Sequence, residues 1–279
     1  MEDKVKTFQR SIFDWHRVHK RDYLPWRISQ KQSVSPYEIF VSEIMLQQTQ
    51  VPRVLEKYPQ FLRAFPTVRH LALSSLASVL KTWQGMGYNR RAFYLKRAAE
   101  EIVSRFGGVI PSDPDKLQKL PGVGSYTAGA VACFAFNKPV VFLDTNIRKV
   151  FLHYFFPRRY RVDDREILAV AEKMLSRRDP RRWHYALMDY GATVLRKERK
   201  LNARAKYYHK QPPFFGSARF FRSQIVKHLL QYKKASEKEL HTLLARDPGP
   251  FLVSLMKDRL VRASDSPRSE AGSIYQIGC

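Results

Sequence analysis

Cysteines and acidic side chains are scarce in this chain of 279 residues. The two cysteines, Cys133 and Cys279, exclude a disulfide framework and any metal or iron–sulfur site built from cysteines alone. The 25 acidic residues are outnumbered by 50 lysines and arginines, which gives a formal net charge of +25. Such an excess indicates a polyanionic partner, and nucleic acid is the first candidate.

Long apolar runs are missing as well. Asn137, Lys138 and Pro139 interrupt the most apolar stretch, residues 128–143, so no segment reaches the roughly 20 residues that span a bilayer. The first residues, MEDKVKTFQR, lack the apolar core of a secretory signal. We therefore expect a cytoplasmic (or nucleoid-associated) protein without a membrane partner. We also expect it to be a monomer. A hydrophobic content of 44% is too high for a disordered basic tail.

Helical periodicity predicts an all-α body. Apolar side chains recur at three- and four-residue steps over residues 37–45 and again over residues 73–83. Ser35 and Ser112 each precede a first turn that contains proline, which is typical of a capped helix start. Segments with the alternating pattern of strands are few.

The composition changes near residue 196. Residues 196–234 hold twelve basic side chains and one acidic side chain, and Pro212-Pro213 with Gly216-Ser217 mark a linker. Three short helical patterns follow, over residues 220–232, 236–246 and 250–260, and residues 261–278 then resemble a strand, a polar turn and a strand. This order predicts a winged helix, and the alternative is a helical cap with a frayed tail.

The most informative segment is the turn Leu120-Pro121-Gly122-Val123-Gly124. Its glycines permit positive φ angles and close backbone approach, and its N–H groups at a helix start suit a DNA phosphate. Its carbonyls could share a monovalent cation with that phosphate. An apolar helical pattern follows over residues 128–136, and the isolated acid Asp144 ends the next apolar run.

This combination resembles the helix-hairpin-helix (HhH-GPD) DNA glycosylase superfamily, and within it the MutY-type adenine DNA glycosylases. The resemblance rests on ordered segments: LPWR (24–27), SEIMLQQTQV (42–51), GMGYNRRA (85–92), LPGVGSYTAGA (120–130), LDTNIRKV (143–150) and ALMDYGATV (186–194). It implies an all-α, two-lobed glycosylase body, followed by the small winged-helix-like (α+β) module.

The expected domain boundaries follow from the same resemblance. The body covers residues 1–213, with a six-helix lobe that carries the hairpin over roughly 30–135. The second lobe joins residues 1–29 to residues 136–213, and the module covers residues 214–279.

The resemblance also implies cleavage of an N-glycosidic bond, which needs a carboxylate near the sugar and an acid near the base. Asp144 matches the carboxylate, which stabilises an oxocarbenium ion or attacks it. Glu43 matches the acid that protonates a purine ring nitrogen, and its apolar helical neighbours Ile39 and Leu46 favour a raised pKa. The alternatives are a helix-capping Asp and a solvated surface Glu.

Residue 126 separates two branches of the superfamily. Bifunctional members that resemble endonuclease III have a lysine there, which forms a Schiff base, whereas this chain has Tyr126. The resemblance therefore implies a monofunctional glycosylase that leaves an abasic site. Tyr126 and Asn146 are expected to position Asp144 by hydrogen bonds, with core packing as the alternative for Tyr126.

A base within a duplex must be flipped out to reach such a site. By resemblance, Gln48 and Tyr88 enter the helix beside the estranged base and Arg91 holds a phosphate, with core packing as the alternative for Tyr88. The expected wall of the base pocket consists of Trp26, Arg27, Leu46, Tyr185 and Met188.

Three departures from the family matter. The family's four cluster cysteines begin where this chain has Leu195, so we expect no [4Fe–4S] cluster and no other cofactor. In place of the cluster, we expect packing by Leu195, Leu201, Tyr207 and Tyr208. The basic run 196–210, with Lys197 and Lys200, is then expected to contact DNA in place of the cluster loop, unless it is merely solvated. The last 65 or so residues are too few for the β-rich domain of MutY enzymes. Tyr185 replaces the Gln or Glu that adenine-specific enzymes tend to have.

The leading hypothesis is a monofunctional, cluster-free glycosylase that removes adenine mispaired with guanine or 8-oxoguanine from double-stranded DNA. One alternative is a glycosylase of the same fold for thymine or uracil opposite guanine, or for a deaminated purine. The other is a non-catalytic DNA-binding protein, against which the two carboxylates argue.

Overall fold

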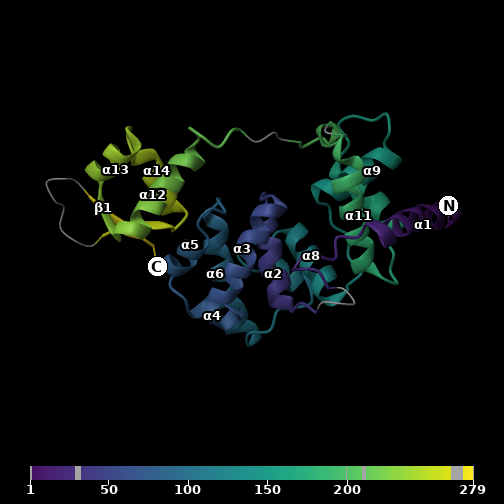
Figure 1. Ribbon diagram of the computed structural model, residues 1–279, viewed down its shortest axis with the longest axis horizontal. Coiled ribbons are helices and arrows are strands. Elements are labelled where there is room, and N and C mark those ends of the chain that lie inside the picture. Colours follow the sequence, from purple (N-terminus) through teal and green to yellow (C-terminus); the bar gives the residue numbers. More distant parts are fainter. Residues whose placement is uncertain (1, 29–32, 199, 209–211, 265–272, 279) are drawn as a thin grey trace. The chain divides into compact units, whose positions relative to one another are not determined.

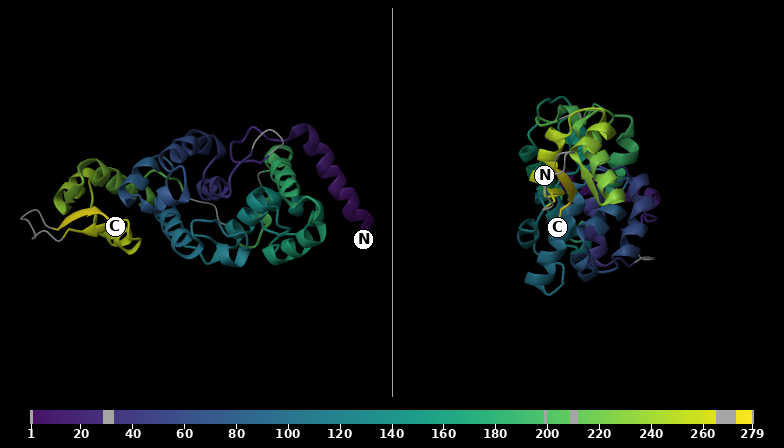
Figure 2. Two further views of the ribbon diagram at one scale, coloured as in Figure 1. Left: turned by 90° about the horizontal axis from the view of Figure 1, so that it is seen from below. Right: turned by 90° about the vertical axis from the view of Figure 1, so that its left-hand side faces the viewer.

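The computed structural model describes residues 2–28, 33–198, 200–208, 212–264 and 273–278 (Figure 1 and Figure 2). Two compact units make up the chain. Unit 1 comprises Met1–Glu43, Pro111–Lys119 and Val123–Lys210, and unit 2 comprises Ile44–Ile110, Leu120–Gly122 and Gln211–Cys279. The predicted fold class is confirmed: the body is helical and the sheet is confined to a small C-terminal module. The predicted domain boundaries stay a prediction.

Unit 1 contains helices from the N-terminal part of the chain and from the part after the hairpin. They are α1 (Glu2–His19), α2 (Pro36–Leu46) as far as Glu43, α7 (Pro114–Gln118), α8 (Ser125–Phe136), α9 (Thr145–Phe155), α10 (Asp164–Met174), α11 (Pro180–Thr193), and the 3₁₀ turns η1 (Val194–Arg196) and η2 (Asn202–Arg204). Helix α11 packs against α1 and α9 (Figure 1). Their aromatic side chains meet edge to face, with the rings of Phe8 and Trp183 5.8 Å apart. Burial of these rings stabilises the lobe.

Helix starts follow the expected capping chemistry, with one correction. Ser35 caps α2, because its Oγ accepts from the Glu38 N–H at 3.2 Å while the Ser35 N–H donates to the Glu38 carboxylate at 2.6 Å. Ser112 was expected to cap the next proline-containing helix, but the cap is Asp113, whose side chain accepts from the Asp115 N–H. A cap must directly precede the first helical residue, which here is Pro114.

The segment after α11 fills the place where the family's cluster loop is expected. Leu195 and Leu201 are buried in the core of unit 1, and a backbone bridge joins Val162 to Ala205. The prediction that Leu195 and Leu201 pack here is confirmed. The same prediction for Tyr207 and Tyr208 is wrong, because their side chains are 62% and 47% exposed.

Unit 2 begins with α3 (Val51–Ala64), α4 (Val68–Leu73), α5 (Leu76–Thr82) and α6 (Arg90–Phe106). Helix α6 packs against α4 and α5, over a core that includes Phe61, Leu80 and Trp83. Leu73 was expected on the buried stripe but is 88% exposed. The periodicity predicts a single helix over residues 73–83. The structure instead ends α4 at Leu73 and starts a second helix, α5, after the cap Ser75.

The C-terminal module has the winged-helix order that the sequence predicts. It consists of α12 (Ala218–Tyr232), β1 (Lys234–Ser236), α13 (Glu237–Leu244), α14 (Gly249–Lys257), β2 (Val261–Ala263) and β3 (Ile274–Ile277). Strand β3 lies between β1 and β2 and is antiparallel to both, with Tyr275 opposite Ala235 and Ala263. The short strand β1 had no sequence signal of its own, and residues 265–272 of the expected turn lie outside the described residues.

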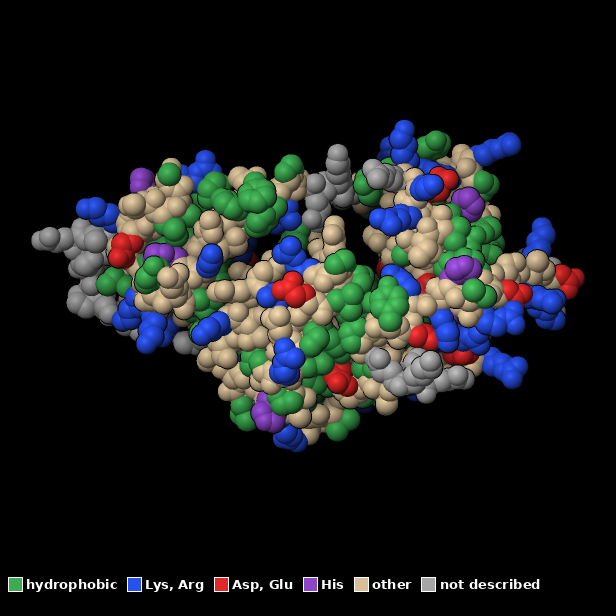
Figure 3. All heavy atoms as spheres, in the orientation of Figure 1, with side chains coloured by type: hydrophobic (Ala, Val, Ile, Leu, Met, Phe, Trp, Pro, Cys, Tyr) green, Lys and Arg blue, Asp and Glu red, His purple; other side chains and the backbone are tan. Residues whose placement is uncertain are grey.

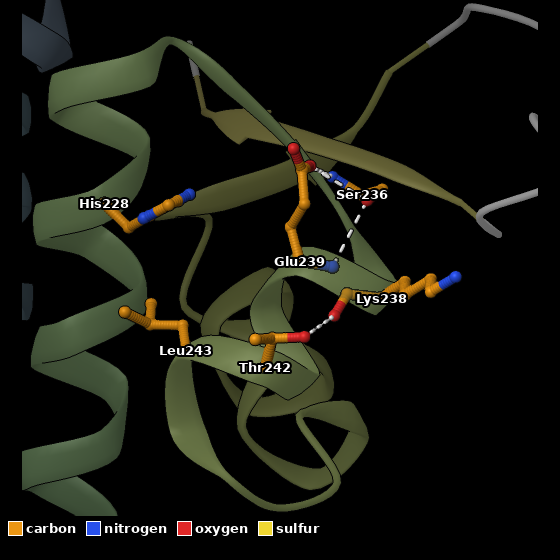
Figure 4. A pocket seen from close by; sticks show the side chains of 6 residues that line it. All are labelled: His228, Ser236, Lys238, Glu239, Thr242 and Leu243. Carbon is orange, nitrogen blue, oxygen red and sulfur yellow. Dashed lines mark hydrogen bonds between the residues drawn. The ribbon is translucent and has the colours of Figure 1, made fainter.

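Helix α13 starts with a capping box, in which Ser236 and Glu239 exchange hydrogen bonds (Figure 4). This box borders an open surface hollow that His228, Lys238, Thr242 and Leu243 also line. No helix among the described residues is both long and apolar enough to cross a membrane.

Candidate active site

The carboxyl group of Glu43 is buried in unit 1. Helix α2 is apolar on nearly all sides, and Glu43 is only 3% exposed. Burial penalises the ionised carboxylate and raises the pKa of Glu43 to about 7, although a hydrogen bond from Tyr126 acts in the opposite direction. The nearby charge of Asp144 raises the pKa further, and Arg27 lowers it. The predicted raised pKa therefore has a physical basis.

Tyr126 touches Glu43. Its hydroxyl, on the first turn of α8, donates to Oε2 of Glu43 at 3.2 Å. We expected Tyr126 to hold Asp144 instead, so this partner is a correction. Burial, followed by the charges of Glu43 and Asp144, raises the pKa of Tyr126 well above its usual value. The phenol therefore stays neutral and acts as a hydrogen-bond donor.

Asp144 caps α9 and is held in one orientation. Its Oδ1 accepts from the backbone N–H groups of Asn146 and Ile147 at 3.0 and 2.6 Å, and its Oδ2 accepts from Asn146 Nδ2 at 3.0 Å. The expected hydrogen bond from Asn146 is present. Burial raises the pKa of Asp144, while the hydrogen bonds from Ile147 and Asn146 oppose the shift. A carboxylate fixed at a helix N-terminus is well suited to stabilise developing positive charge.

Gly191 allows α11 to lie directly against the start of α9. A Cβ atom added at Gly191 would lie 2.3 Å from the backbone oxygen of Asn146. No side chain fits into that space, so the packing of α11 fixes the backbone that presents Asp144. Gly191 belongs to the ALMDYGATV segment, but the sequence alone does not show that its position lies against the backbone of Asn146.

Arg27 and Tyr185, two residues of the expected base pocket, form one buried stack. The guanidinium carbon of Arg27 lies 4.4 Å from the centroid of the Tyr185 ring. Both Nη atoms of Arg27 donate to Asp189 at 2.7 Å. Burial opposes ionisation of Asp189, but the adjacent His16 ring and the hydrogen bonds from Arg27 outweigh it and lower its pKa. The stack is therefore held by an ionised carboxylate.

Sequence reasoning missed Asp189. It is fully buried on α11 and also accepts from the Arg21 backbone N–H at 3.1 Å and from Arg21 Nε at 2.5 Å. The sequence did contain a signal: Asp189 is the lone charged residue in the ALMDYGATV segment. A buried acid in such a segment requires a cationic partner, and the LPWR segment supplies Arg27.

The remaining pocket residues are placed as follows. Trp26 is buried in unit 1, and Met188 is half-buried there on α11. Leu46 is the half-buried last residue of α2 and belongs to unit 2. Their contact with a flipped base stays a prediction.

The two residues expected to enter DNA, Gln48 and Tyr88, both lie in unit 2 with unusual backbone angles. Their φ values are +53° and +48°, and residues other than glycine rarely adopt this region of backbone conformation. Gly85 and Gly87 beside Tyr88 also have positive φ. Strained backbone of this kind is often found at functional sites.

Arg91 has a different role from the one expected. We expected it to hold a phosphate, but its guanidinium donates to the carbonyls of Ile44, Met45, Gln47, Met86 and Gly87 and to the hydroxyl of Thr49. Burial lowers the pKa of Arg91 to about 10, so it remains charged at neutral pH. Arg91 thus fastens the turn that carries Gln48 to the turn that carries Tyr88.

The expected DNA-contacting groups of the hairpin and of the basic run differ in exposure. Gly122 and Gly124 are exposed in the hairpin, where Pro121 is half-buried and Val123 is buried. Gly122 has a φ of +74°, and a Cβ atom there would lie 2.5 Å from Cβ of Tyr94, so glycine is required. Lys197 and Lys200 are exposed after η1. Lys and Arg side chains are numerous over the part of unit 1 that holds α1, α9 and α11 (Figure 3).

Among the described residues, apolar side chains fill the position at which the family's iron–sulfur cluster is expected. Leu195 stands at the first ligand position and is packed among apolar side chains. No three His, Cys, Asp or Glu side chains of the described residues form a group that could hold a metal ion. Residues of this kind do not fit a cluster, and its absence stays an expectation from the cysteine content.

Comparison with known proteins agrees with this geometry. Residues 41–177 match the family model described as "HhH-GPD superfamily base excision DNA repair protein". This span contains Glu43, the hairpin, Tyr126 and Asp144. Over these residues the chain is similar to the HhH-GPD superfamily.

Several curated relatives are named adenine DNA glycosylase. The Mycobacterium tuberculosis (strain H37Rv) protein is 40% identical over 190 residues, which cover 66% of this chain and 60% of that one. The human protein is 34% identical over 209 residues, covering 71% of this chain and 38% of that one. The chain thus spans about half the length of the curated relatives it matches, from 38% to 60% among these and the Buchnera aphidicola protein.

Solved structures show the same fold. A thermostable thymine-DNA glycosylase is 26% identical, with a TM-score of 0.61, and the match covers 74% of this chain and 97% of that one. Endonuclease III in a non-covalent DNA complex is 18% identical, with a TM-score of 0.59 over 69% of this chain and 86% of that one.

Proposed function

We propose that this protein is a monofunctional DNA glycosylase of base excision repair, which removes a flipped-out, mispaired adenine from double-stranded DNA as a monomer. The observation that carries the proposal is the buried group of Glu43, Tyr126 and Asp144, inside the segment that matches the HhH-GPD family. Glu43 has a pKa near neutrality because it is buried, which suits a general acid.

The proposed reaction divides the work between the two carboxyl groups. Glu43, protonated, donates its proton to a ring nitrogen of adenine as the bond between that base and C1′ breaks. Asp144 is fixed at the start of α9, where hydrogen bonds from Ile147 and Asn146 favour its carboxylate form, and it stabilises the positive charge on the sugar. Water then adds to C1′, and its released proton returns to the Glu43 carboxylate. The products are the free base and an abasic site.

The absence of strand cleavage rests on Tyr126. Its phenol occupies the position at which endonuclease III-like members have the Schiff-base lysine, and a phenol cannot form an imine with C1′. Its hydrogen bond to Glu43 gives it another use, because that bond lowers the pKa of the acid. The strand should therefore remain intact until alkali cleaves the abasic site.

DNA binding is proposed to use the hairpin and the basic surface. Exposed Gly122 and Gly124 let the hairpin backbone approach a phosphate, where its carbonyls could also share a monovalent cation. Lys197 and Lys200 are proposed to contact phosphates where the family has its cluster loop. Neither contact needs an iron–sulfur cluster.

Thymine opposite guanine is a second candidate substrate. The thymine-DNA glycosylase named above is matched over 97% of its length, whereas the adenine enzymes extend well beyond the matched region. Tyr185 also favours it, because a buried phenol on Arg27 cannot offer the paired donor and acceptor of a carboxamide to adenine. The names of the curated relatives favour adenine.

A panel of duplexes distinguishes the candidates. With enzyme in excess, base release is measured from A opposite G, 8-oxoguanine and C, from T and U opposite G, and from hypoxanthine opposite T, each with and without hot alkali. Release of A that needs alkali to show a nick supports the proposal. Release of T or U alone would favour the second candidate substrate. A nick without alkali would show that the protein also cleaves the strand, which contradicts a monofunctional glycosylase. Binding without base release would show that the protein is not a glycosylase.

A further inference from the structure

Tyr88 is held by two arginines within unit 2. The guanidinium carbon of Arg91 lies 5.5 Å from the centroid of the Tyr88 ring, and that of Arg219 lies 5.1 Å from it. Arg219 Nη1 also donates a hydrogen bond to the Tyr88 hydroxyl. Arg91 belongs to α6, next to the Tyr88 turn, but Arg219 lies on the first turn of α12, in the C-terminal module.

Arg219 is itself braced. Ser217 caps α12 by accepting from the Phe220 N–H, and the second Nη atom of Arg219 donates to the Pro212 carbonyl at 2.8 Å. The guanidinium therefore presents a fixed donor to the phenol. A hydrogen bond from a charged donor is stronger than one between neutral groups, so it favours one orientation of the Tyr88 hydroxyl.

The module has a second, separate tie to the same helices. Asp258, at the end of α14, forms ion pairs with Arg222 of α12 and with Arg90 of α6, the latter at 3.4 Å. If Arg219 served only to attach the module to the body, the Arg222–Asp258–Arg90 group would serve the same purpose. That group does not touch the Tyr88 hydroxyl, so it provides a matched control.

We propose that Arg219 is a positioning residue for Tyr88, and that the C-terminal module thereby takes part in opening the DNA duplex. The inference rests on the proposed function, in which Tyr88 enters the helix beside the estranged base. The guanidinium groups of Arg91 and Arg219 both contact the Tyr88 ring, and the hydrogen bond from Arg219 fixes the direction of its hydroxyl. The partner implied for this face of the module is the duplex next to the flipped nucleotide.

The test measures duplex opening separately from base release. A duplex with 2-aminopurine beside the A:G mispair is bound by the full-length protein with Asp144→Asn, which keeps the base attached. Arg219→Ala, Tyr88→Phe and the double variant are compared, because Tyr88→Phe keeps the ring and removes the hydroxyl. Arg222→Ala is the matched control.

Each single variant should lower the opening constant about tenfold, because both remove the same hydrogen bond. Arg219→Ala also removes the contact with the Tyr88 ring, so the double variant should lose no more than Arg219→Ala alone. Arg222→Ala should leave opening within about twofold. Multiplied losses in the double variant, or an equal loss with Arg222→Ala, would overturn the proposal. Failure of the proposed function would show instead as an absence of base release by the wild type, whatever the opening signal.

Discussion

The Tyr126 hydroxyl donates to Oε2 of Glu43 at 3.2 Å, so the residue at the lysine position of bifunctional relatives touches the proposed general acid. This contact opposes the effect of burial, which raises the pKa of Glu43 to about 7. A group with that pKa is partly protonated at neutral pH, as proton donation to a leaving base requires. Tyr126 thus tunes the acid instead of attacking the sugar.

The pH dependence of base release should show this tuning. The single-turnover rate is expected to fall above about pH 7, as Glu43 loses its proton. Tyr126→Phe removes a hydrogen bond that lowers this pKa, so the alkaline limb should move to higher pH. Tyr154→Phe, which removes a phenol bonded to Tyr190 instead, should leave the limb in place. An alkaline limb that stays fixed in Tyr126→Phe would count against the assignment.

Stability should depend on pH through the same residue. The pKa of Glu43 rises from 4.5 to about 7 on folding, so its protonated form contributes stability below pH 4.5 that is lost as the pH rises through 7. The glutamine of Glu43→Gln does not ionise, so the variant does not lose this stability as the pH rises. The excess free energy of unfolding of Glu43→Gln over wild type should grow by about 3 kcal/mol between pH 4 and pH 8, as measured by urea unfolding. A constant difference across that range would show that Glu43 is not buried.

Removal of the charge on Asp189 should be severely destabilising. Asp189→Asn leaves Arg27 buried without a counter-ion, which costs about 3–5 kcal/mol. Arg177→Ala breaks the exposed ion pair with Glu172 and should cost less than about 1 kcal/mol. Thermal or urea unfolding measures both, and equal losses would mean that the buried group carries no special weight.

A methyl group at Gly191 should disturb the start of α9. Gly191→Ala places Cβ 2.3 Å from the Asn146 oxygen, so α9 must shift, at a cost of about 1–3 kcal/mol and with a larger loss of base release than of DNA affinity. Gly124→Ala is the stability control, because no atom lies within 4 Å of a Cβ there. If both variants unfold at the same urea concentration, Gly191 of α11 does not lie as close to the Asn146 backbone of α9 as described.

Periodicity and caps are local signals, and they predicted the helical body and the winged-helix order. The segments that carry Glu43 and Asp144 were predicted from the family resemblance. The sequence did not predict the hydrogen-bond partners of individual side chains. Tyr126 donates a hydrogen bond to Glu43 and not to Asp144, and Arg91 donates to backbone carbonyls instead of a phosphate. These choices depend on which turns meet in space, as does the burial of Asp189. The exposure of Leu73 depended on one helix boundary, which periodicity alone cannot place.

The most direct test of the account is Asp144→Asn on an A:G duplex, with DNA affinity and single-turnover adenine release measured on the same protein. Asparagine preserves the cap of α9 and removes only the negative charge. The account predicts binding within about threefold of wild type, because cap and fold are kept, and a loss of release of at least about a thousandfold. Release at the wild-type rate would contradict the central role of Asp144 and with it the proposed mechanism.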